Sequence, residues 1–223
     1  MCRKPDRQYL KKAIHGSQIQ FMGKFDIAKT KLSGYTMFKR IPNLVQDEMH
    51  RNDGKMEMDI TKLFHKYTVR FLTDTDIPMI YDLAAGNPLF YRHCPPFVTK
   101  ESIAYDMMVL PPNKSYEDKY YIGFFNGAKL VAIMDLIMGY PNYNTAFIGF
   151  FMVDKSEQGM GTGTFIISEC SIYLKSMGYS CIRLGYVKGN PQSKSFWEKN
   201  GFVKTGVESK QDRYTVVIMQ KEL

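Results

Sequence analysis

The 223-residue sequence predicts an α/β fold in which a central sheet is flanked by helices. Two apolar stretches joined by Asn126-Gly127 have the turn chemistry of a β-hairpin, so part of the sheet is antiparallel. The nearly continuous apolar stretch from Ala146 to Val153 is typical of a central strand, and an amphipathic segment follows it. Between them lies a glycine-rich turn, Gln158-Gly159-Met160-Gly161-Thr162-Gly163, which predicts a strand-to-helix junction that binds an anionic group.

The first elements of the pattern are one strand and two helices. The strand is predicted at Tyr67 to Leu72, and Thr73-Asp74-Thr75-Asp76 supplies caps for the helix after it. Gly86-Asn87-Pro88 ends that helix, and Thr99-Lys100-Glu101 begins the second. The connection from Asn87 to Val98 is rich in aromatic residues and suits either the wall of a pocket or ordinary packing of a long loop.

The rest of the pattern completes the order β-α-α-β-β-β-α-β-α-β-β. In the helix after the glycine-rich turn, Ile166, Cys170, Tyr173 and Met177 are predicted to share one face, and Gly178 ends this helix. The last helix is predicted at Pro191 to Asn200. The remaining strands are predicted at Tyr120 to Phe125, Leu130 to Met138, Ala146 to Val153, Cys181 to Val187, Phe202 to Val207 and Tyr214 to Gln220.

The composition is that of a cytosolic globular protein. Hydrophobic residues make up 44% of the chain and aromatic residues 14%, which is enough for a packed core. No run of eighteen apolar residues and no signal-peptide pattern is present, so we expect no membrane segment. The four cysteines form no Cys-x-x-Cys pair and the four histidines have no ligand spacing, so we expect reduced thiols and no metal.

The positive charge is concentrated at the beginning of the chain. Residues 1–57 contain 12 Lys and Arg against 6 Asp and Glu, whereas residues 58–223 contain 18 against 16. We therefore divide the chain into a basic N-terminal extension, 1–57, and a nearly neutral domain, 58–223, which is not expected to bind nucleic acid. The extension is either a loosely ordered arm, a nucleic-acid-binding arm, or a segment upstream of a translation start at Met56 or Met58.

The spacing of the glycine-rich turn selects among phosphate-binding motifs. A Walker loop needs a lysine directly after its last glycine, and none follows Gly161 or Gly163. A dinucleotide fingerprint needs a glycine where Thr164 stands, and an acidic residue near Arg183. The pattern that matches is Gln-x-x-Gly-x-Gly, formed by Gln158, Gly161 and Gly163. Its glycines allow a bulky phosphate group to approach the main chain.

A second motif lies near the C-terminus, in Gly189-Asn190-Pro191-Gln192-Ser193-Lys194-Ser195-Phe196-Trp197-Glu198-Lys199-Asn200-Gly201-Phe202. Asn190 can cap a helix that Asn200-Gly201 then stops. With the glycine-rich turn, these residues resemble the GCN5-related N-acetyltransferases over residues 66–222. Asn190, Phe196, Gly201 and Phe202 match that superfamily's Asn-x-x-Ala-x-x-Phe-Tyr-x-x-x-Gly-Phe pattern.

The resemblance implies a fold and a coenzyme. The fold is a central mixed, mostly antiparallel β-sheet with a V-shaped splay, flanked by helices on both faces. The coenzyme is acetyl-CoA, a cosubstrate, with the pantetheine arm between the splayed strands and the pyrophosphate on the glycine-rich turn. The residues that the resemblance assigns to coenzyme binding are Phe151, Val153, Gln158, Gly159, Met160, Gly161, Thr162, Gly163, Thr164, Asn190, Phe196 and Trp197.

The activity that the resemblance implies is N-acetylation of a primary amine by direct attack in a ternary complex. A small-molecule amine is our first expectation, and a protein N-terminus or lysine is the alternative. A noncatalytic acyl-CoA sensor is a rival from another class. Similar proteins often form dimers, so a homodimer is compatible with the resemblance.

Two residues bear on the chemistry. Asp135 interrupts an apolar strand, where a carboxylate is costly to bury unless it is paired or used, so it is the candidate base. The alternative is that Asp135 faces solvent or pairs with a lysine or arginine. Trp197 stands where the family usually has an acidic tyrosine, and an indole N–H cannot deliver its proton at neutral pH. The general acid is therefore left unassigned.

Overall fold

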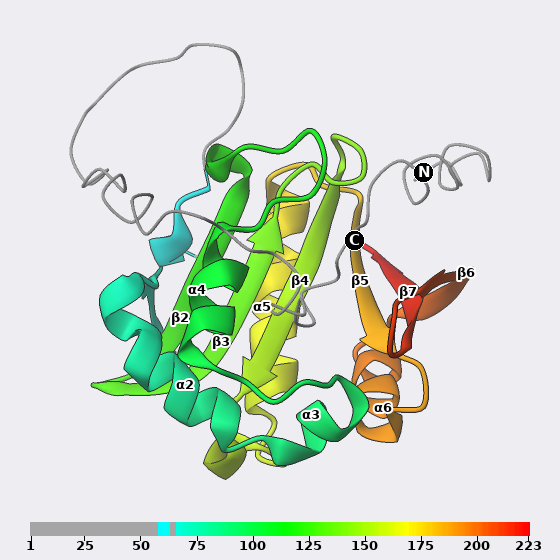
Figure 1. Cartoon of the computed structure of the whole chain (residues 1–223). Coiled ribbons are helices and arrows are strands. Elements are labelled where there is room, and N and C mark those ends of the chain that lie inside the picture. The colour runs from blue at the N-terminus through cyan, green and yellow to red at the C-terminus, as the bar shows by residue number, and fades with distance from the viewer. Residues whose placement is uncertain (1–57, 63–65) are drawn as a thin grey trace. The chain divides into compact units, whose positions relative to one another are not determined.

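The computed structural model describes residues 58–62 and 66–223, which form a seven-stranded sheet with helices on both faces (Figure 1). The strand order is β1-β2-β3-β4-β5-β7-β6. The proposed extension, 1–57, lies outside the described residues. The strands are β1 (Thr68–Phe71), β2 (Lys119–Asn126), β3 (Lys129–Ile137), β4 (Thr145–Val153), β5 (Cys181–Val187), β6 (Val203–Lys210) and β7 (Thr215–Glu222).

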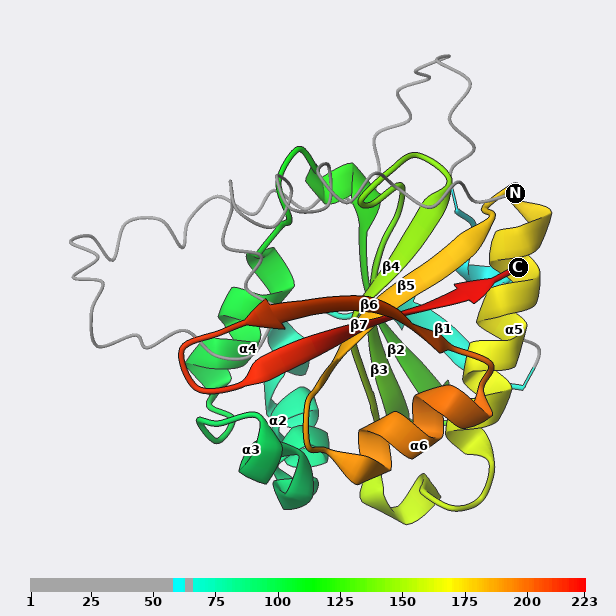
Figure 2. The same ribbon diagram turned by 90° about the vertical axis from the view of Figure 1, so that its right-hand side faces the viewer.

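The helices are divided between the two faces of the sheet. Figure 2 shows α2, α3 and α4 on one side and α5 and α6 on the other. In the described part of the chain, no helix is both long and apolar enough to cross a membrane. The α-helices are α2 (Ile77–Ala85), α3 (Pro88–His93), α4 (Lys100–Met108), α5 (Thr162–Ser176) and α6 (Pro191–Lys199). Single 3₁₀ turns lie at Ile60–Lys62, Asp74–Asp76, Tyr116–Asp118 and Lys155–Glu157.

The sheet opens between β4 and β5. These strands are parallel and pair only where Thr145–Ile148 faces Cys181–Leu184, while β5 continues to pair with β7 as far as Val187. On the other edge of β4, the register with β3 shifts at Gly149, because Asp135 faces Phe150 whereas Leu136 faces Ile148. A β-bulge bends the strand that contains it. The V-shaped splay that the resemblance implied is therefore present, and it begins at the bulge.

Apolar cores lie on both faces of the sheet. On the α2 and α4 side, Ile80, Leu83 and Ile103 pack against Tyr121 and Ile133. On the other side, α5 buries Ile166, Ile167, Cys170, Ser171 and Leu174. The face predicted for this helix was partly wrong, because Tyr173 and Met177 are half-buried and Ile167 and Leu174 are fully buried instead. The buried stripe is thus rotated by about one residue.

The connection between the first two predicted helices contains a helix of its own. Residues 88–93, predicted as loop, form α3. Pro88 occupies the first turn, where a main-chain N–H would have no partner within the helix, so its absence from proline costs nothing. Arg92 and His93 lie in the last turn, where positive charge is favourable. The turn residues that end α2 therefore also begin α3. Cys94, which follows α3, is buried, as are Cys170 and Cys181, and none of these three is in a disulfide.

Candidate functional site

The glycine-rich turn ends at Gly161, the N-cap of α5. Gly159 and Gly161 have φ angles of 79° and 84°, a left-handed conformation that side chains with a Cβ adopt at a cost. The first N–H donated within the helix is that of Phe165, to Gly161 O at 2.9 Å. The main-chain N–H groups of residues 162–164 thus precede the helical ladder and lie at the positive end of the helix dipole.

The three glycines of this region serve different purposes. A Cβ built on Gly159 or Gly161 would meet no atom within 4 Å, so the surface above the turn is open. A Cβ on Gly163 would lie 3.0 Å from the Phe196 ring and 3.3 Å from Val153 Cγ2. Gly163 therefore allows close packing among α5, α6 and β4, whereas the other two glycines set the backbone conformation of the turn.

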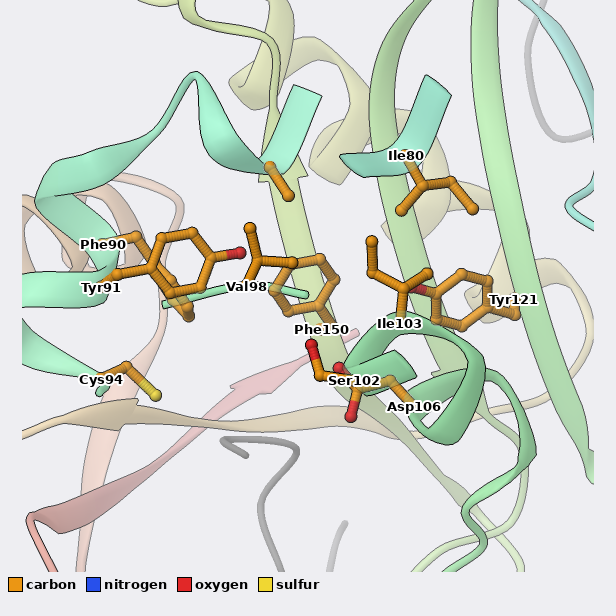
Figure 3. Close-up of a pocket in the computed structure, with 11 residues that line it drawn as sticks. Ile80, Phe90, Tyr91, Cys94, Val98, Ser102, Ile103, Asp106, Tyr121 and Phe150 are labelled. Atoms are coloured by element: carbon orange, nitrogen blue, oxygen red, sulfur yellow. The ribbon is translucent and has the colours of Figure 1, made fainter. Parts of the chain in front are cut away.

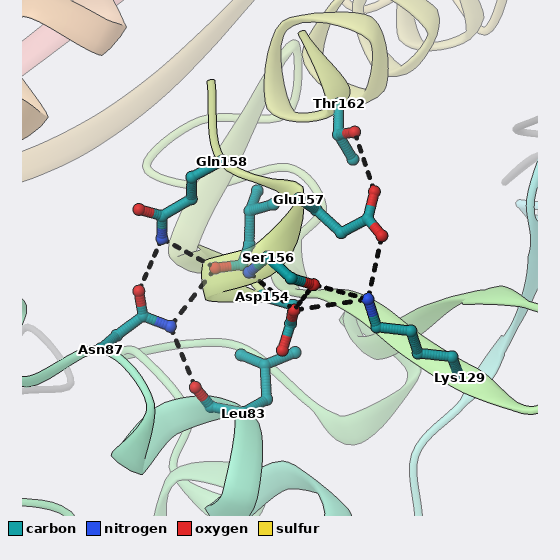
Figure 4. Close-up of polar contacts among 9 residues, drawn as sticks. Leu83, Asn87, Lys129, Asp154, Ser156, Glu157, Gln158 and Thr162 are labelled. Atoms are coloured by element: carbon teal, nitrogen blue, oxygen red, sulfur yellow. Dashed lines mark hydrogen bonds and ion pairs between the residues drawn. The ribbon is translucent and has the colours of Figure 1, made fainter. Parts of the chain in front are cut away.

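The Gln158 side chain connects the turn to the end of α2 through hydrogen bonds (Figure 4). Its Nε2 donates to Asn87 Oδ1 at 2.6 Å and to Val153 O at 3.0 Å. Asn87, which follows α2, donates in turn to Leu83 O at 2.9 Å and to Val153 O at 3.3 Å. This set of bonds connects the end of α2, the end of β4 and the glycine-rich turn.

A charged cluster holds the other side of the same loop. Lys129 Nζ lies 3.0 Å from Glu157 Oε1, 3.5 Å from Asp154 Oδ1 and 2.6 Å from Ser156 Oγ (Figure 4). Glu157 also accepts from Thr162 Oγ1 at 3.4 Å. Lys129 thus offsets two carboxylates that would otherwise repel an anion on the turn.

A cavity, here called the splay cavity, lies where β4 and β5 diverge. Since Asp154 N–H bonds to Val131 O on β3, strand alternation directs the main-chain groups of Phe151 and Val153 toward the splay. Val153 O already accepts the two side-chain bonds described above. Residues of β4, β5, α6 and the β6–β7 connection contribute to the lining, among them Ile148, Phe151, Leu184, Tyr186, Asn190, Ser193, Trp197 and Tyr214.

The second motif shapes the floor of the splay cavity. Asn190 caps α6 as expected, accepting from Ser193 N–H at 3.0 Å, and its side chain is buried. Trp197 is also buried, with ring centroids 6.0 Å from Phe151 and 5.2 Å from Phe202. Phe196 stacks on Phe151 at 5.9 Å. This region therefore presents packed aromatic rings to the cavity.

A second cavity, here called the helical cavity, lies between the sheet and helices α2 to α4 (Figure 3). Part of this space is open to solvent at the mouth of the cavity. Phe90, Cys94 and Phe150 line both cavities, so the two share a wall. The remaining lining residues are Ile80, Ala84, Tyr91, Val98, Ser102, Ile103, Asp106 and Tyr121.

Asp135 lies on β3, opposite Tyr121 of β2, and lines neither cavity. Its carboxylate is 1% exposed and forms an ion pair with Lys119 Nζ at 2.8 Å, which is 3% exposed. Burial raises the pKa of Asp135 to about 6, while the charge of Lys119 acts in the opposite direction. Pairing with a lysine was the alternative to a catalytic role, and this geometry matches that alternative. The role of Asp135 as a base stays a prediction.

Residues 79–202 match the model of the acetyltransferase (GNAT) family. The chain belongs to the GNAT family. Its members are acyltransferases, and the glycine-rich turn, the splay and the second motif of this GNAT domain all lie within or beside the matched residues. No curated protein matches the sequence.

Solved structures share the GNAT fold at low sequence identity. An acetyltransferase from Thermus thermophilus is 19% identical, with 71% of this chain and 98% of that chain covered and a TM-score of 0.58. The PaiA N-acetyltransferase from Thermoplasma acidophilum, in complex with coenzyme A, is 18% identical, with coverage of 71% and 100% and a TM-score of 0.52. The ribosomal-protein-S18-alanine N-acetyltransferase from Escherichia coli is 16% identical, with coverage of 70% and 93% and a TM-score of 0.51.

The site of this GNAT domain suits coenzyme A on two counts. The open surface above Gly159 and Gly161 and the N–H groups of residues 162–164 provide donors for a pyrophosphate. The splayed edge of β4 provides main-chain groups for an extended amide chain. Among residues 58–62 and 66–223, no group of three His, Cys, Asp or Glu side chains could hold a metal ion.

Tyr214 is not among the site residues predicted from the sequence. It follows the turn between β6 and β7, lines the splay cavity, and is hydrogen-bonded to Cys94. Burial, the Cys94 thiol and the charge of Asp106 all raise the pKa of Tyr214, so its hydroxyl stays protonated at neutral pH. No local pattern marks this residue, because it reaches the site only when β7 pairs with β5 in the sheet.

Proposed function

We propose that this GNAT domain transfers an acetyl group from acetyl-CoA to a primary amine of a small molecule, by direct attack in a ternary complex. The observation that carries the proposal is that the splay cavity and the helical cavity share the wall formed by Phe90, Cys94 and Phe150. A thioester held in the first cavity would thus lie next to an amine held in the second. The PaiA structure, which contains coenzyme A, supports the choice of coenzyme.

The reaction replaces a carbon–sulfur bond by a carbon–nitrogen bond. The neutral amine nitrogen attacks the thioester carbon, and we assign stabilisation of the oxyanion to the main-chain N–H groups of β4 that face the splay. The carbon–sulfur bond then breaks, sulfur leaves with the electron pair and gains a proton, and the nitrogen loses a proton. We assign Tyr214, a protonated side chain that lines the splay cavity, to hydrogen bonding with the leaving sulfur.

Asp135 is kept as the candidate base. It faces Tyr121, which lines the helical cavity, so a proton from the amine would have to reach it past that residue. The ion pair with Lys119 favours a structural role instead. A substitution that removes both charges would separate the two roles.

Titration calorimetry of the full-length protein with acetyl-CoA and, separately, with NADH tests the coenzyme. We expect micromolar binding of acetyl-CoA alone, and release of free coenzyme A thiol when amines are added. Binding without turnover across small amines and peptides would instead support the noncatalytic sensor, which Trp197 favours because it replaces the usual acidic tyrosine. Acetylation of peptides but not of small amines would support the protein-directed alternative. The cytosolic location and the homodimer stay predictions.

A further inference from the structure

We propose that the helical cavity is the acceptor site for a compact hydrophobic primary amine, whose ammonium group is held by Asp106. This inference rests on the proposed acetyl transfer and names its substrate class. The family alone does not specify that class, and the Escherichia coli structure is named for a protein alanine substrate. The substrate class must therefore be inferred from the residues that line the cavity.

The walls of the cavity are apolar. Ile80, Ala84, Val98 and Ile103 are all less than 9% exposed and come from α2, the segment after α3, and α4. Burying an unpaired amide or hydroxyl in such surroundings costs about 2–7 kcal/mol. A peptide or a polyamine would have to bury several polar groups here, whereas a short alkyl or aryl body would bury none. The walls of the cavity therefore favour an amine whose carbon skeleton is hydrophobic.

Aromatic rings complete the enclosure. Phe90, Tyr91, Tyr121 and Phe150 line the cavity, with the Phe90 ring centroid 5.0 Å from that of Tyr91 and 5.9 Å from that of Phe150. Both pairs meet edge to face, the geometry that aromatic pairs prefer. Ring faces attract ammonium groups and also pack well against apolar chains. The enclosure thus favours a molecule with a cationic end and an apolar body.

Among the described residues that line the cavity, Asp106 supplies the one carboxylate. It lies one helical turn after Ser102 on α4, and Figure 3 places both side chains beside Phe150. The Ser102 hydroxyl belongs to the helix cap, because it donates to Thr99 O at 2.9 Å and accepts from Thr99 N–H at 3.1 Å. Asp106 is therefore the lining residue whose charge can select an ammonium group over a neutral one.

The negative charge of Asp106 acts across both cavities. After burial, it is the largest cause that raises the pKa values of Tyr91 and Tyr121 in the helical cavity, and it contributes to the raised pKa of Tyr214 in the splay cavity. A cation at this position would thus lie near the wall that the two cavities share. The amine nitrogen is then close to the place where the thioester carbon is expected.

The first experiment compares ligands on unaltered, full-length protein saturated with coenzyme A. The probes are n-hexylamine, 2-phenylethylamine, the uncharged isostere n-hexanol, spermidine, and a short peptide with a free N-terminus. We expect the two hydrophobic amines to bind at least about tenfold more tightly than n-hexanol, since a charge-assisted hydrogen bond is lost in the alcohol. Equal binding of the amine and the alcohol, or preference for spermidine or the peptide, would overturn the inference.

The second experiment assigns the selectivity to Asp106. Asp106→Asn should weaken binding of n-hexylamine by about ten- to a hundredfold and leave binding of n-hexanol and acetyl-CoA unchanged. Asp106→Glu, which keeps the charge, should restore part of the preference for the amine. Asp82→Asn is the matched control, because Asp82 undergoes the same change on the exposed surface of α2. If Asp106→Asn folds and keeps its preference for the amine, Asp106 does not hold the ammonium group.

The two proposals fail in different ways. If acetyl-CoA does not bind, the proposed acetyl transfer fails, whatever the amines do. If acetyl-CoA binds and peptides or spermidine are acetylated while hydrophobic amines are not, the acetyl transfer stands and the acceptor assignment fails. Acetylation of n-hexylamine that is lost in Asp106→Asn and retained in Asp82→Asn supports both.

Discussion

The two cavities that meet at Phe150 are built in different ways. The proposed coenzyme side offers the main-chain N–H groups of consecutive residues, 162–164, whose geometry is set by two left-handed glycines and the start of a helix. The helical cavity uses side chains from α2, α3 and the segment after it, α4, β2 and β4, and among the described lining residues one, Asp106, supplies the charge. Main-chain sites tolerate many side chains around them, whereas a side-chain cavity changes its ligand with each substitution. The coenzyme side should therefore serve any GNAT reaction, and the helical cavity should set the acceptor.

The largest expected effect concerns the buried ion pair beneath the helical cavity. Asp135→Asn leaves the Lys119 ammonium buried without a counter-charge, so we expect the free energy of unfolding to fall by about 3–5 kcal/mol in urea denaturation. The double substitution Lys119→Met with Asp135→Leu removes both charges and should restore most of that loss. Asp212→Asn, an exposed residue in the β6–β7 turn, is the control and should change stability by less than about 0.5 kcal/mol.

The double variant also decides whether Asp135 is a base. If it folds, binds acetyl-CoA and turns over normally, Asp135 has only a structural role; if it binds but does not turn over, the base assignment is supported. The pH dependence provides a further check. The pKa of Asp135 is raised from 3.8 to about 6, so between these values the folded state holds a proton that the unfolded state has released. The contribution of Asp135 to stability should therefore decrease as pH rises through this window, and this dependence should be absent from the double variant.

The second prediction compares two glycines at opposite ends of α5. Gly161 and Gly178 have φ angles of 84° and 85°, and a Cβ on either would meet no atom within 4 Å. Valine at either position should cost about 1–3 kcal/mol of backbone strain, so both variants should lose thermal stability to a similar extent. Only Gly161→Val should weaken acetyl-CoA binding in calorimetry, by about a hundredfold, because it obstructs at least two charge-assisted hydrogen bonds to the pyrophosphate. Equal acetyl-CoA affinity in the two variants would refute the role of the turn.

The smallest expected effect tests the connection between the two sides. Gln158→Ala removes the bonds to Asn87 Oδ1 and Val153 O, so the turn should be less well positioned and the KM for acetyl-CoA should rise by about tenfold. Gln192→Ala is the matched control, since the Gln192 side chain donates only a 3.4 Å bond, to Gln158. A double-mutant cycle of Asn87→Ala and Gln158→Ala should give a coupling energy of about 1 kcal/mol. If the free-energy changes of the two single substitutions simply add, the glycine-rich turn and the end of α2 are independent.

Local signals were sufficient for most elements. The hairpin at Asn126-Gly127 and the caps at Thr73 and Thr99 were predicted correctly, because turn and cap chemistry depends on neighbouring residues. The helix at residues 88–93 was not predicted, because the proline that ends one helix can also begin the next. The family was also identifiable from sequence, since its motif specifies consecutive main-chain groups.

Apart from α3, the sequence by itself determined the order of the elements, and it determined the glycine-rich turn and the GNAT fold, since these depend mainly on motifs of residues close together in the chain. Only the tertiary structure decided that Asp135 pairs with Lys119, and that Cys94 and Tyr214 meet at the splay. It also placed Asp106 in a cavity with residues of α2 and α3. The physical reason is distance along the chain: the contacts that form the helical cavity join strands and helices whose packing depends on the whole sheet, and no local pattern encodes that packing.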